Sequence, residues 1–337
     1  MYKIPECEMS MFEDAVILIT GGTGTVGHFF LDSLLVSNCV FKEIRIFSRD
    51  EKKQFDMKQT ISDKRVKYYI GDVKDISSVM VAMRGVDYVL HTAALKQVPS
   101  MEVFPFEAVK TNIIGTNNVI LAAIEHNVKK FICVSTDKAV YPVNAMGMSK
   151  ALMEKVLLSK AMEDGIATQI VCVRLGNVLG SRGSVLPVFV QGVLTGRGII
   201  ITGKNMTRFI MLAEEVVQLI VYAFNNATTG QIIVKKLDAC SIQNLAEAVI
   251  DLFNASNSSM KIVDSRPGES EDESLLTEEE IKCTYLKNGY YIVSQEVTTG
   301  EINASQLNSA TMESMSMAAI KEKLLKVDYI LQMIKNR

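Results

Sequence analysis

The stretch VILITGGTGTVGHFFLDSLL, residues 16–35, joins an apolar run to a segment with apolar residues at helical spacing, and glycines stand between them. Gly21, Gly24 and Gly27 permit a tight turn and a close approach of backbone N–H groups to a ligand. The N-terminus of the following helix carries partial positive charge, which suits a pyrophosphate. Because the apolar run predicts a buried strand, the stretch predicts a strand, a dinucleotide-binding turn and a helix.

Short apolar runs rich in β-branched and aromatic residues recur along the first 175 residues. They are AVILIT (15–20), EIRIFS (43–48), VKYYI (66–70), VDYVLHT (86–92), KKFICVS (129–135) and TQIVCVRL (168–175). Helical patterns separate them, such as FEAVKTNIIGTNNVILAAIEH at 106–126. Strands that alternate with helices in this way predict an α/β fold with a doubly wound parallel Rossmann sheet covered on both faces.

The pattern changes after about residue 178. Glycines cluster in GSRGSV (180–185), and the acidic stretch RPGESEDESLLTEEE (266–280) is too polar to add much core, so it should form surface loops or a cap over a cleft. The run LAEEVVQLIVYAFNN (212–226) is predicted to return to the sheet. The run AAIKEKLLKVDYILQMIK (318–335) is predicted to be one amphipathic helix.

These patterns predict two parts of the chain. A Rossmann domain, expected to bind the dinucleotide, covers 1–177 and about 211–238. A smaller, mixed C-terminal lobe, expected to bind the substrate, covers 178–210 and 239–337.

The composition excludes several function classes. With 36 basic and 38 acidic residues the net charge is -2, which gives no electrostatic footprint for nucleic acid. No run approaches about 18 apolar residues and the start lacks a signal-peptide core, so we expect a cytoplasmic protein without membrane insertion. No ligand pattern for a metal is present. The cysteines form no C-x-x-C pair and are predicted to be buried thiols in a reducing compartment; they are Cys7, Cys39, Cys133, Cys172, Cys240 and Cys283.

The end of the second predicted strand, FSRDEKKQ, bears on the choice of cofactor. An adenine ribose with a free 2′-OH prefers an acidic residue here, whereas a 2′-phosphate prefers Arg and Lys. Asp50 favours NAD, but Ser48, Arg49, Lys52 and Lys53 outnumber it, so the sequence favours NADP. The remaining cofactor candidates lie in the glycine turn and after later strands: Thr23, Thr25, Val26, Asp72, Val73, Thr92, Ala93, Ala94, Lys96, Asn112, Ser135 and Lys150.

The stretch STDKAVYPVNAMGMSK, residues 135–150, follows the fifth predicted strand, at the edge where open parallel sheets hold their ligands. Met146 and Lys150 lie one helical turn apart on one face, so Lys150 can reach a nicotinamide ribose. Met146 offers no ionisable proton and is predicted to pack beside the nicotinamide. Asp137 and Lys138 suit an acid and a base, and the alternative is a solvated Asp–Lys turn on the surface.

Together these motifs resemble the extended short-chain dehydrogenase/reductase family, and within it the UDP-N-acetylglucosamine 4,6-dehydratases. The resemblance rests on TGGTGTVG, FSRDEKKQ, YIGDV, HTAALKQVP, VKTNIIGT, STDKAVYPVNAMGMSKALMEK, RLGNVLGSRGSVLP and MTRF. STDKA with NAMG-x-SK is most similar to the inverting group, which combines dehydration with 5-epimerisation. Several members carry Met where others have Tyr, so Met146 marks a subgroup.

The resemblance implies a reaction in which tightly bound, recycled NADP takes a hydride from C4 of the hexose and returns it to C6. The C4 ketone makes the C5 proton removable, and water leaves across C5 and C6. Lys138 suits the base if burial and cationic neighbours lower its pKa, and Asp137 suits the acid. Thr136, helped by Lys150, is favoured to take the C4 hydroxyl proton, and Tyr141 is the alternative.

A UDP-sugar needs cations for its pyrophosphate and polar contacts for the uridine and the sugar. The candidates are Lys96, Lys138, Asn177, Arg182, Ser184, Val185, Arg208, Arg266 and Glu269, of which the resemblance favours Asn177, Arg208 and Arg266. It also implies a homo-oligomer that pairs through the helix with Met146 and the helix at 106–126.

Two other functions stay open. A UDP-sugar 4-epimerase that interconverts GlcNAc and GalNAc would share the fold but has no use for the pair Asp137–Lys138. A non-catalytic NADP-binding regulator would explain Met146, but not the presence of Asp137, Lys138 and Lys150.

Overall fold

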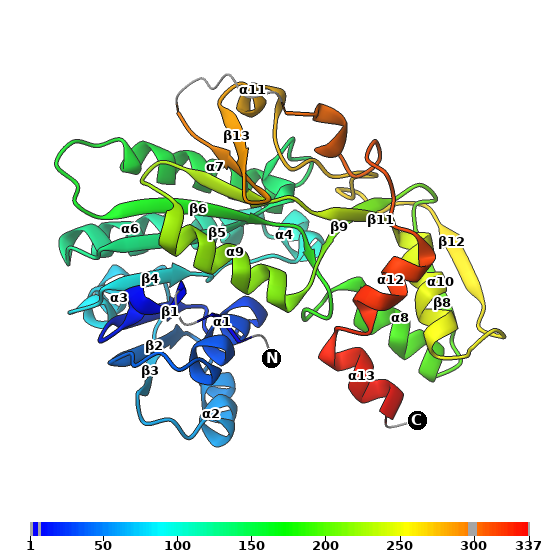
Figure 1. The fold of residues 1–337 in the computed structure, drawn as a ribbon, viewed down its shortest axis with the longest axis horizontal. Coiled ribbons are helices and arrows are strands. Elements are labelled where there is room, and N and C mark those ends of the chain that lie inside the picture. Colours follow the sequence, from blue (N-terminus) through cyan, green and yellow to red (C-terminus); the bar gives the residue numbers. More distant parts are fainter. Residues whose placement is uncertain (1–2, 6–7, 296–301, 336–337) are drawn as a thin grey trace.

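The computed structural model describes residues 3–5, 8–295 and 302–335. Its centre is a nine-stranded sheet in the order β13-β14-β10-β6-β5-β4-β1-β2-β3 (Figure 1). The strands are β1 (Val16–Thr20), β2 (Glu43–Ser48), β3 (Val66–Ile70), β4 (Tyr88–His91), β5 (Lys130–Thr136), β6 (Gln169–Leu175), β10 (Ile232–Lys235), β13 (Thr284–Lys287) and β14 (Tyr290–Val293). The first seven of these pair in parallel, which confirms the doubly wound α/β fold.

Helices cover both faces of this sheet. On one face α1 packs against α9, and on the other α6 packs between α3 and α7 (Figure 1). The bounds are α1 (Thr25–Val36), α2 (Glu51–Thr60), α3 (Ile76–Met83), α4 (Val98–Val103), α5 (Pro105–Ala108), α6 (Gly115–Glu125), α7 (Ala145–Ala161) and α9 (Ala213–Asn226). The helix predicted at 106–126 is confirmed, with a π-helical turn at Val109–Ile114 between α5 and α6. Such turns are frequent at functional sites.

A smaller lobe stands beside the carboxyl edge of the sheet, with its own apolar core. It contains β7 (Asn177–Val178), β8 (Ile199–Thr202), β9 (Thr207–Met211), β11 (Asp238–Ser241), β12 (Met260–Val263), α8 (Val185–Leu194), α10 (Ile242–Leu252), α12 (Met317–Leu324) and α13 (Asp328–Lys335). The single helix predicted at 318–335 is therefore wrong. The chain bends between α12 and α13, and the bend buries Val327 against the lobe.

The last part of the chain is divided between the two cores. β13 and β14 lie within the range expected for the smaller lobe, but they extend the large sheet, because β14 pairs antiparallel with β10. The acidic stretch 266–280 also adds more core than its composition predicts, since Leu275 and Leu276 are buried in the large core. It ends in the short helix α11 (Glu278–Ile281).

Some expectations from composition are met only in part. Cys133, Cys172 and Cys240 are buried, whereas Cys39 and Cys283 are half-buried, and Cys7 lies outside the described residues.

Within the described ranges no helix has the length and apolar character to cross a bilayer. The same ranges hold no cluster of three or more His, Cys, Asp or Glu side chains suited to a metal ion.

Candidate active site

One cleft of about 1210 Å³ lies at the carboxyl ends of the parallel strands, between the sheet and the smaller lobe. It exceeds the roughly 300–1,000 Å³ of an ordinary single-ligand pocket, so it has room for a dinucleotide and a second ligand. The predicted residues that line it are Gly21, Thr23, Gly24, Thr25, Val26, Ser48, Arg49, Asp50, Lys53, Asp72, Val73, Thr92, Ala93, Ala94, Lys96, Ser135, Thr136, Lys138, Met146, Lys150, Asn177, Arg182, Ser184, Arg266 and Glu269.

The glycine turn forms one end of the cleft. Gly21 has a φ of 64°, and a Cβ there would lie 2.7 Å from the Cα of Ala93, so only glycine fits. Gly27 faces away from the cleft and packs on Gly22, where a Cβ would lie 2.6 Å from the Gly22 Cα. α1 begins after Gly24, and no side chain of the described chain caps its N-terminus. The uncapped N–H groups beside this close backbone approach fit a pyrophosphate.

The end of β2 forms the adjoining wall, where the adenine ribose would lie. Asp50 caps α2 by accepting from the Lys53 backbone N–H at 3.0 Å, and its carboxylate pairs with Lys53 Nζ at 2.7 Å. These hydrogen bonds lower the pKa of Asp50. Arg49 lies 3.8 Å from Asp72, with 57% of its side chain exposed. Lys52 is outside the cleft, because its side chain pairs with Asp56 on the exposed side of α2.

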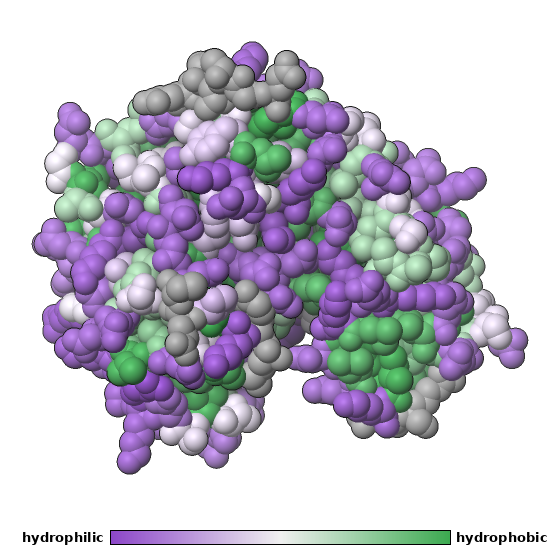
Figure 2. Space-filling model, viewed as in Figure 1, coloured by the Kyte–Doolittle hydropathy of each residue, from purple (hydrophilic) through white to green (hydrophobic). Residues whose placement is uncertain are grey.

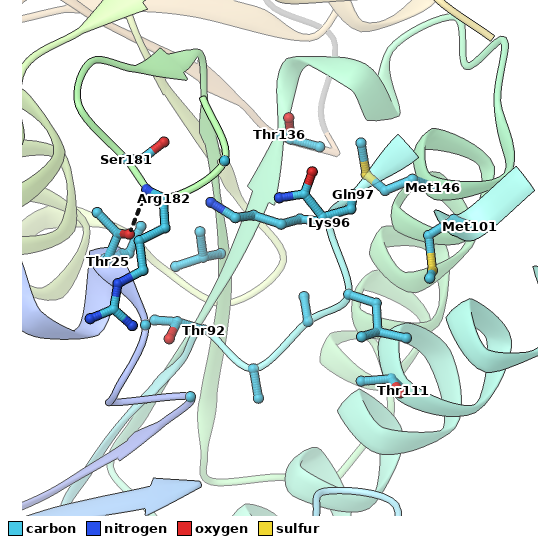
Figure 3. Close-up of a pocket in the computed structure, with 18 of the residues that line it drawn as sticks. Thr25, Thr92, Lys96, Gln97, Met101, Thr111, Thr136, Met146, Ser181 and Arg182 are labelled. Carbon is cyan, nitrogen blue, oxygen red and sulfur yellow. Dashed lines mark hydrogen bonds between the residues drawn. The ribbon is translucent and has the colours of Figure 1, made fainter. Parts of the chain in front are cut away.

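A loop from the smaller lobe crosses to the glycine turn. The Arg182 backbone N–H donates to Thr25 Oγ1 at 3.3 Å, and Figure 3 shows the Arg182 side chain beside Thr25, with Lys96 extending toward the same loop. Burial lowers the pKa of His28 on α1, and the charge of Arg182 acts in the same direction. Burial and then Arg182 also lower the pKa of Lys96. Arg182, expected to contact the substrate, thus lines the cleft beside the glycine turn.

The catalytic candidates lie where β5 ends. Lys138 lines the cleft, and its Nζ is 3.0 Å from Asp137 Oδ1, 3.2 Å from Asn177 Oδ1 and 3.2 Å from Glu273 Oε1. Asp137 is wholly buried, so the reading as a solvated turn is wrong. Asp137 does not line the cleft itself, but Thr136 does, and Thr136 Oγ1 donates to Asp137 Oδ1 at 3.0 Å. Asp137 therefore contacts the cleft through Thr136 and Lys138.

The charges around Lys138 differ from those that the sequence suggested. Burial lowers the pKa of Lys138, but the charges of Asp137 and Glu273 raise it by more, so the net shift is upward. Burial raises the pKa of Glu273. The positive charges of Lys138 and Arg208 act in the opposite direction but do not cancel this rise. The condition that cationic neighbours lower the pKa of Lys138 is not met, because two carboxylates contact it. Glu273 was missed, since in sequence it is one of several acidic residues in a polar stretch.

Met146 and Lys150 line the cleft as expected. Met146 is 4% exposed and packs against Met101 and Ala108, and Figure 3 shows Met101 and Met146 on the same side of the cleft. Lys150 Nζ donates to the Val134 carbonyl at 2.7 Å.

Tyr141 does not line the cleft, although the sequence suggested it as an alternative to Thr136 there. Its side chain is 54% exposed, and its hydroxyl accepts from the backbone N–H of Glu278 at 2.7 Å. The hydroxyl is thus held at the start of α11. The backbone of Tyr141 also adopts a left-handed conformation, with a φ of 46°.

Three more predicted residues lie outside the lining. Arg208 donates to the carbonyls of Thr207, Ser270 and Glu271, and its Nε lies 3.5 Å from Glu273 Oε1. The Asn112 amide bonds both backbone groups of Leu95 and so supports the cleft wall. Val185 is the first residue of α8.

Buried polar atoms without partners mark where a ligand would bind. In the described part of the chain, buried atoms without a hydrogen-bond partner include Thr111 Oγ1, Ser135 Oγ, Asn177 Nδ2 and Ser184 Oγ, all on residues that line the cleft. Buried polar atoms in native proteins nearly always have partners, so ligand atoms are expected opposite these groups. Thr111 was not predicted, because nothing in its local sequence shows that the π-helical turn faces the cleft.

The sequence profile described as "Polysaccharide biosynthesis protein" matches residues 17–295. The chain belongs to this family. A UDP-glucose 4-epimerase from Rickettsia prowazekii (strain Madrid E) is 43% identical over 341 residues, which cover 97% of this chain and 100% of that protein.

Solved structures show the same fold. Pen from Bacillus thuringiensis matches with a TM-score of 0.88 and 34% identity, covering 93% of this chain and 99% of that one. DesIV, a dTDP-glucose 4,6-dehydratase from Streptomyces venezuelae solved with NAD and TYD bound, matches with a TM-score of 0.68 over 76% of this chain and 86% of that one. At 21% identity this second likeness concerns the fold alone. The expected Rossmann architecture of short-chain dehydrogenases/reductases is therefore confirmed.

Proposed function

We propose that this protein dehydrates UDP-N-acetylglucosamine to a UDP-2-acetamido-2,6-dideoxy-4-keto-hexose, with inversion at C5, for surface-polysaccharide or other glycan synthesis. The observation that carries the proposal is the buried cluster of Asp137, Lys138 and Glu273, which contacts the cleft through Lys138. Elimination across C5 and C6 needs groups that move protons at those carbons. Epimerisation at C4 needs no such cluster.

The proposed cofactor is NADP, held tightly and recycled. When bound, it would supply hydride chemistry at C4 and C6 of the sugar. The glycine turn fits its pyrophosphate, and Arg49 and Lys53 lie at the wall expected for a 2′-phosphate. Asp50 is already engaged as a helix cap and in the pair with Lys53, which weakens the argument that it binds a ribose 2′-OH.

Different residues of the chain are proposed to carry out the separate proton transfers. Lys138 is the proposed base at C5, because it is the cluster member that lines the cleft. Thr136 is proposed to relay protons between Asp137 and the sugar hydroxyls, first at C4 and then for the hydroxyl that leaves C6. Lys150 is proposed to orient the nicotinamide ribose. The C4 hydroxyl proton and the C6 hydroxyl leave together as water, so the protons balance.

A second candidate, a UDP-sugar 4-epimerase, is supported by the name of the Rickettsia relative at 43% identity. A non-catalytic regulator has less support, because Thr136, Lys138 and Lys150 all line the cleft beside the proposed cofactor site.

The purified protein, with its bound nucleotide, should be incubated with UDP-N-acetylglucosamine and, separately, with UDP-glucose. Mass spectrometry then gives the masses of the products. A product lighter by one water supports the dehydratase. An isomer of equal mass supports the epimerase, and unchanged substrate in both samples supports the regulator. In deuterated water, deuterium at C5 in a product of inverted configuration would support the inversion.

We further propose a homodimer that pairs through α6 and α7. Exposed apolar side chains recur on both helices at helical spacing: Ile114 and Leu121 around α6, and Met148 and Leu152 on α7. Large exposed apolar patches on soluble proteins usually mark an interface.

A further inference from the structure

We infer that Glu273 accepts the proton that Lys138 carries at rest, so that Lys138 faces the bound sugar as a neutral amine. The inference rests on the proposed function, in which Lys138 is the base at C5. Glu273 itself does not line the cleft, so it acts through Lys138 and is a positioning residue.

The geometry permits direct transfer between the two side chains. Glu273 Oε1 lies 3.2 Å from Lys138 Nζ, which is within hydrogen-bonding distance. The backbone of Glu273 is held on both sides by Ser309: the Glu273 N–H donates to Ser309 Oγ at 2.9 Å, and the Ser309 N–H donates to the Glu273 carbonyl at 2.9 Å. With 6% exposure, the Glu273 side chain is also shielded from solvent that would otherwise compete for the proton.

The charges around the pair distinguish Glu273 from Asp137. The groups that face Glu273 are Lys138 and Asp137 from the turn after β5 and Arg208 from β9. The Oδ1 atom of Asp137 already accepts from both Thr136 Oγ1 and Lys138 Nζ, each at 3.0 Å. Besides Lys138, Glu273 Oε1 has the Nε atom of Arg208 at 3.5 Å, and burial raises the pKa of Glu273 despite these two cations. Because Asp137 Oδ1 is hydrogen-bonded to Thr136 at 3.0 Å, whereas the Arg208 contact of Glu273 is longer, the proton is assigned to Glu273.

The transfer moves one proton and changes no other bond. It leaves Nζ of Lys138 and joins Oε1 of Glu273, which turns an ammonium and a carboxylate into an amine and a carboxylic acid with the same net charge. A sugar nucleotide that fills the cleft would exclude water from Lys138, and loss of water disfavours the charged pair relative to the neutral one. The amine then takes the C5 proton and later releases it to solvent, while a water-borne proton reaches C5 from the opposite face and inverts it.

The decisive variant is Glu273→Gln, which keeps the shape of the side chain and can still accept a hydrogen bond from Lys138, but cannot take its proton. In the wild type, kcat is expected to be nearly flat between about pH 6 and 9, because the transfer conserves net charge. In Glu273→Gln, Lys138 must lose its proton to solvent. We therefore expect kcat at pH 7 to fall at least about tenfold and to recover as the pH rises.

Two further variants separate proton transfer from structural support. Glu273→Asp retains a carboxylate, so its kcat should be lower but the profile should stay flat. Glu271→Gln changes an exposed side chain in the same segment and should match the wild type in kcat, pH profile and melting temperature.

The outcomes separate this inference from the proposed function. The wild type could form the dehydrated product while the kcat of Glu273→Gln depends on pH in the same way as that of the wild type. In that case only the role of Glu273 is overturned. A sloping profile for Glu273→Asp or for the wild type overturns it too. If the wild type forms only an isomer of equal mass, the proposed dehydration and the role of Glu273 fall together.

Discussion

Met146 contributes packing to the candidate site and carries no ionisable group. A methionine at this position has no proton to give, and the structure uses it for packing against Met101 and Ala108. Thr136 also lines the cleft, and the hydrogen bond from its hydroxyl to the buried Asp137 connects it to a carboxylate. The proposed proton carriers thus lie at the end of β5 and not on α7, so the proposed acid–base chemistry does not depend on an ionisable group at position 146.

Arg49 and Arg182 should contribute differently to cofactor binding. Arg49 lies at the wall where a 2′-phosphate would stand, so Arg49→Met should weaken NADP⁺ binding by about tenfold and leave NAD⁺ binding nearly unchanged. Arg182 lies beside the glycine turn, so Arg182→Met should weaken both nucleotides. Equilibrium titration of nucleotide-free protein would measure the four affinities.

Arg266→Met is the matched control for these titrations, because Arg266 also lines the cleft but is expected to contact the sugar nucleotide. Equal losses for NADP⁺ and NAD⁺ in Arg49→Met would contradict the assignment of the 2′-phosphate site.

At the scale of elements, a buried ion cluster ties α11 to the sheet and to α7. Arg174 on β6 bonds Glu154 Oε2 at 2.7 Å and Glu280 Oε1 at 2.6 Å, and it also donates to the Leu275 carbonyl at 3.2 Å. α11 follows the segment that carries Glu273. The cluster therefore holds in place the part of the chain that delivers Glu273 to Lys138.

Removing Arg174 should be costly, because two carboxylates would remain near one another without their partner. We expect Arg174→Met to lower the free energy of unfolding by about 3–5 kcal/mol, measured by urea denaturation.

The same cluster gives an acid-sensitive contribution. Burial raises the pKa of Glu280, but the hydrogen bonds and charge of Arg174 lower it by more, so the folded value lies below the ordinary 4.5. A depressed folded pKa means that the stabilisation is complete above about pH 4.5 and is lost as the pH falls through the folded value. Glu280→Gln should be less stable than wild type at pH 7, and the difference should shrink in acid. A constant difference across this range would argue against the ion pair as its source.

At the scale of the whole molecule, the two lobes present different surfaces. Figure 2 shows a mainly polar face over the Rossmann domain and an apolar patch on the smaller lobe near α8 and α13. The apolar residues of α6 and α7 form a separate surface, and these helices pack beside each other. Because α7 also carries Met146 and Lys150, an interface there would hold the helix that lines the cleft.

Leu152→Asp should disrupt the proposed dimer, since a charge in the centre of an apolar interface loses its water without gaining a partner. We expect the wild type to have twice the mass of the chain by light scattering and Leu152→Asp to be monomeric. Val188→Asp places the same charge on α8 in the other lobe, at a site that is 63% exposed against 52% for Leu152, and should remain dimeric. A monomeric wild type, or a dimeric Leu152→Asp, would rule out this interface.

The sequence by itself determined the Rossmann sheet, the glycine turn and the strand ends that line the cleft. These features depend on spacing along the chain: apolar runs predict strands, helical periods predict the helices between them, and parallel strands bring their carboxyl ends to one edge. Gly21, Thr136, Lys138, Met146 and Lys150 could therefore be placed together before any contact was known.

Only the tertiary structure decided which groups surround Lys138. Glu273 is distant from it along the chain and reaches it because the polar stretch after Arg266 folds back beneath the cleft, held by Ser309 and by Arg174. Contacts with groups that are distant in sequence also decide the positions of Arg182, Tyr141 and Arg208. No local period encodes such contacts, because they form only when distant segments pack against each other.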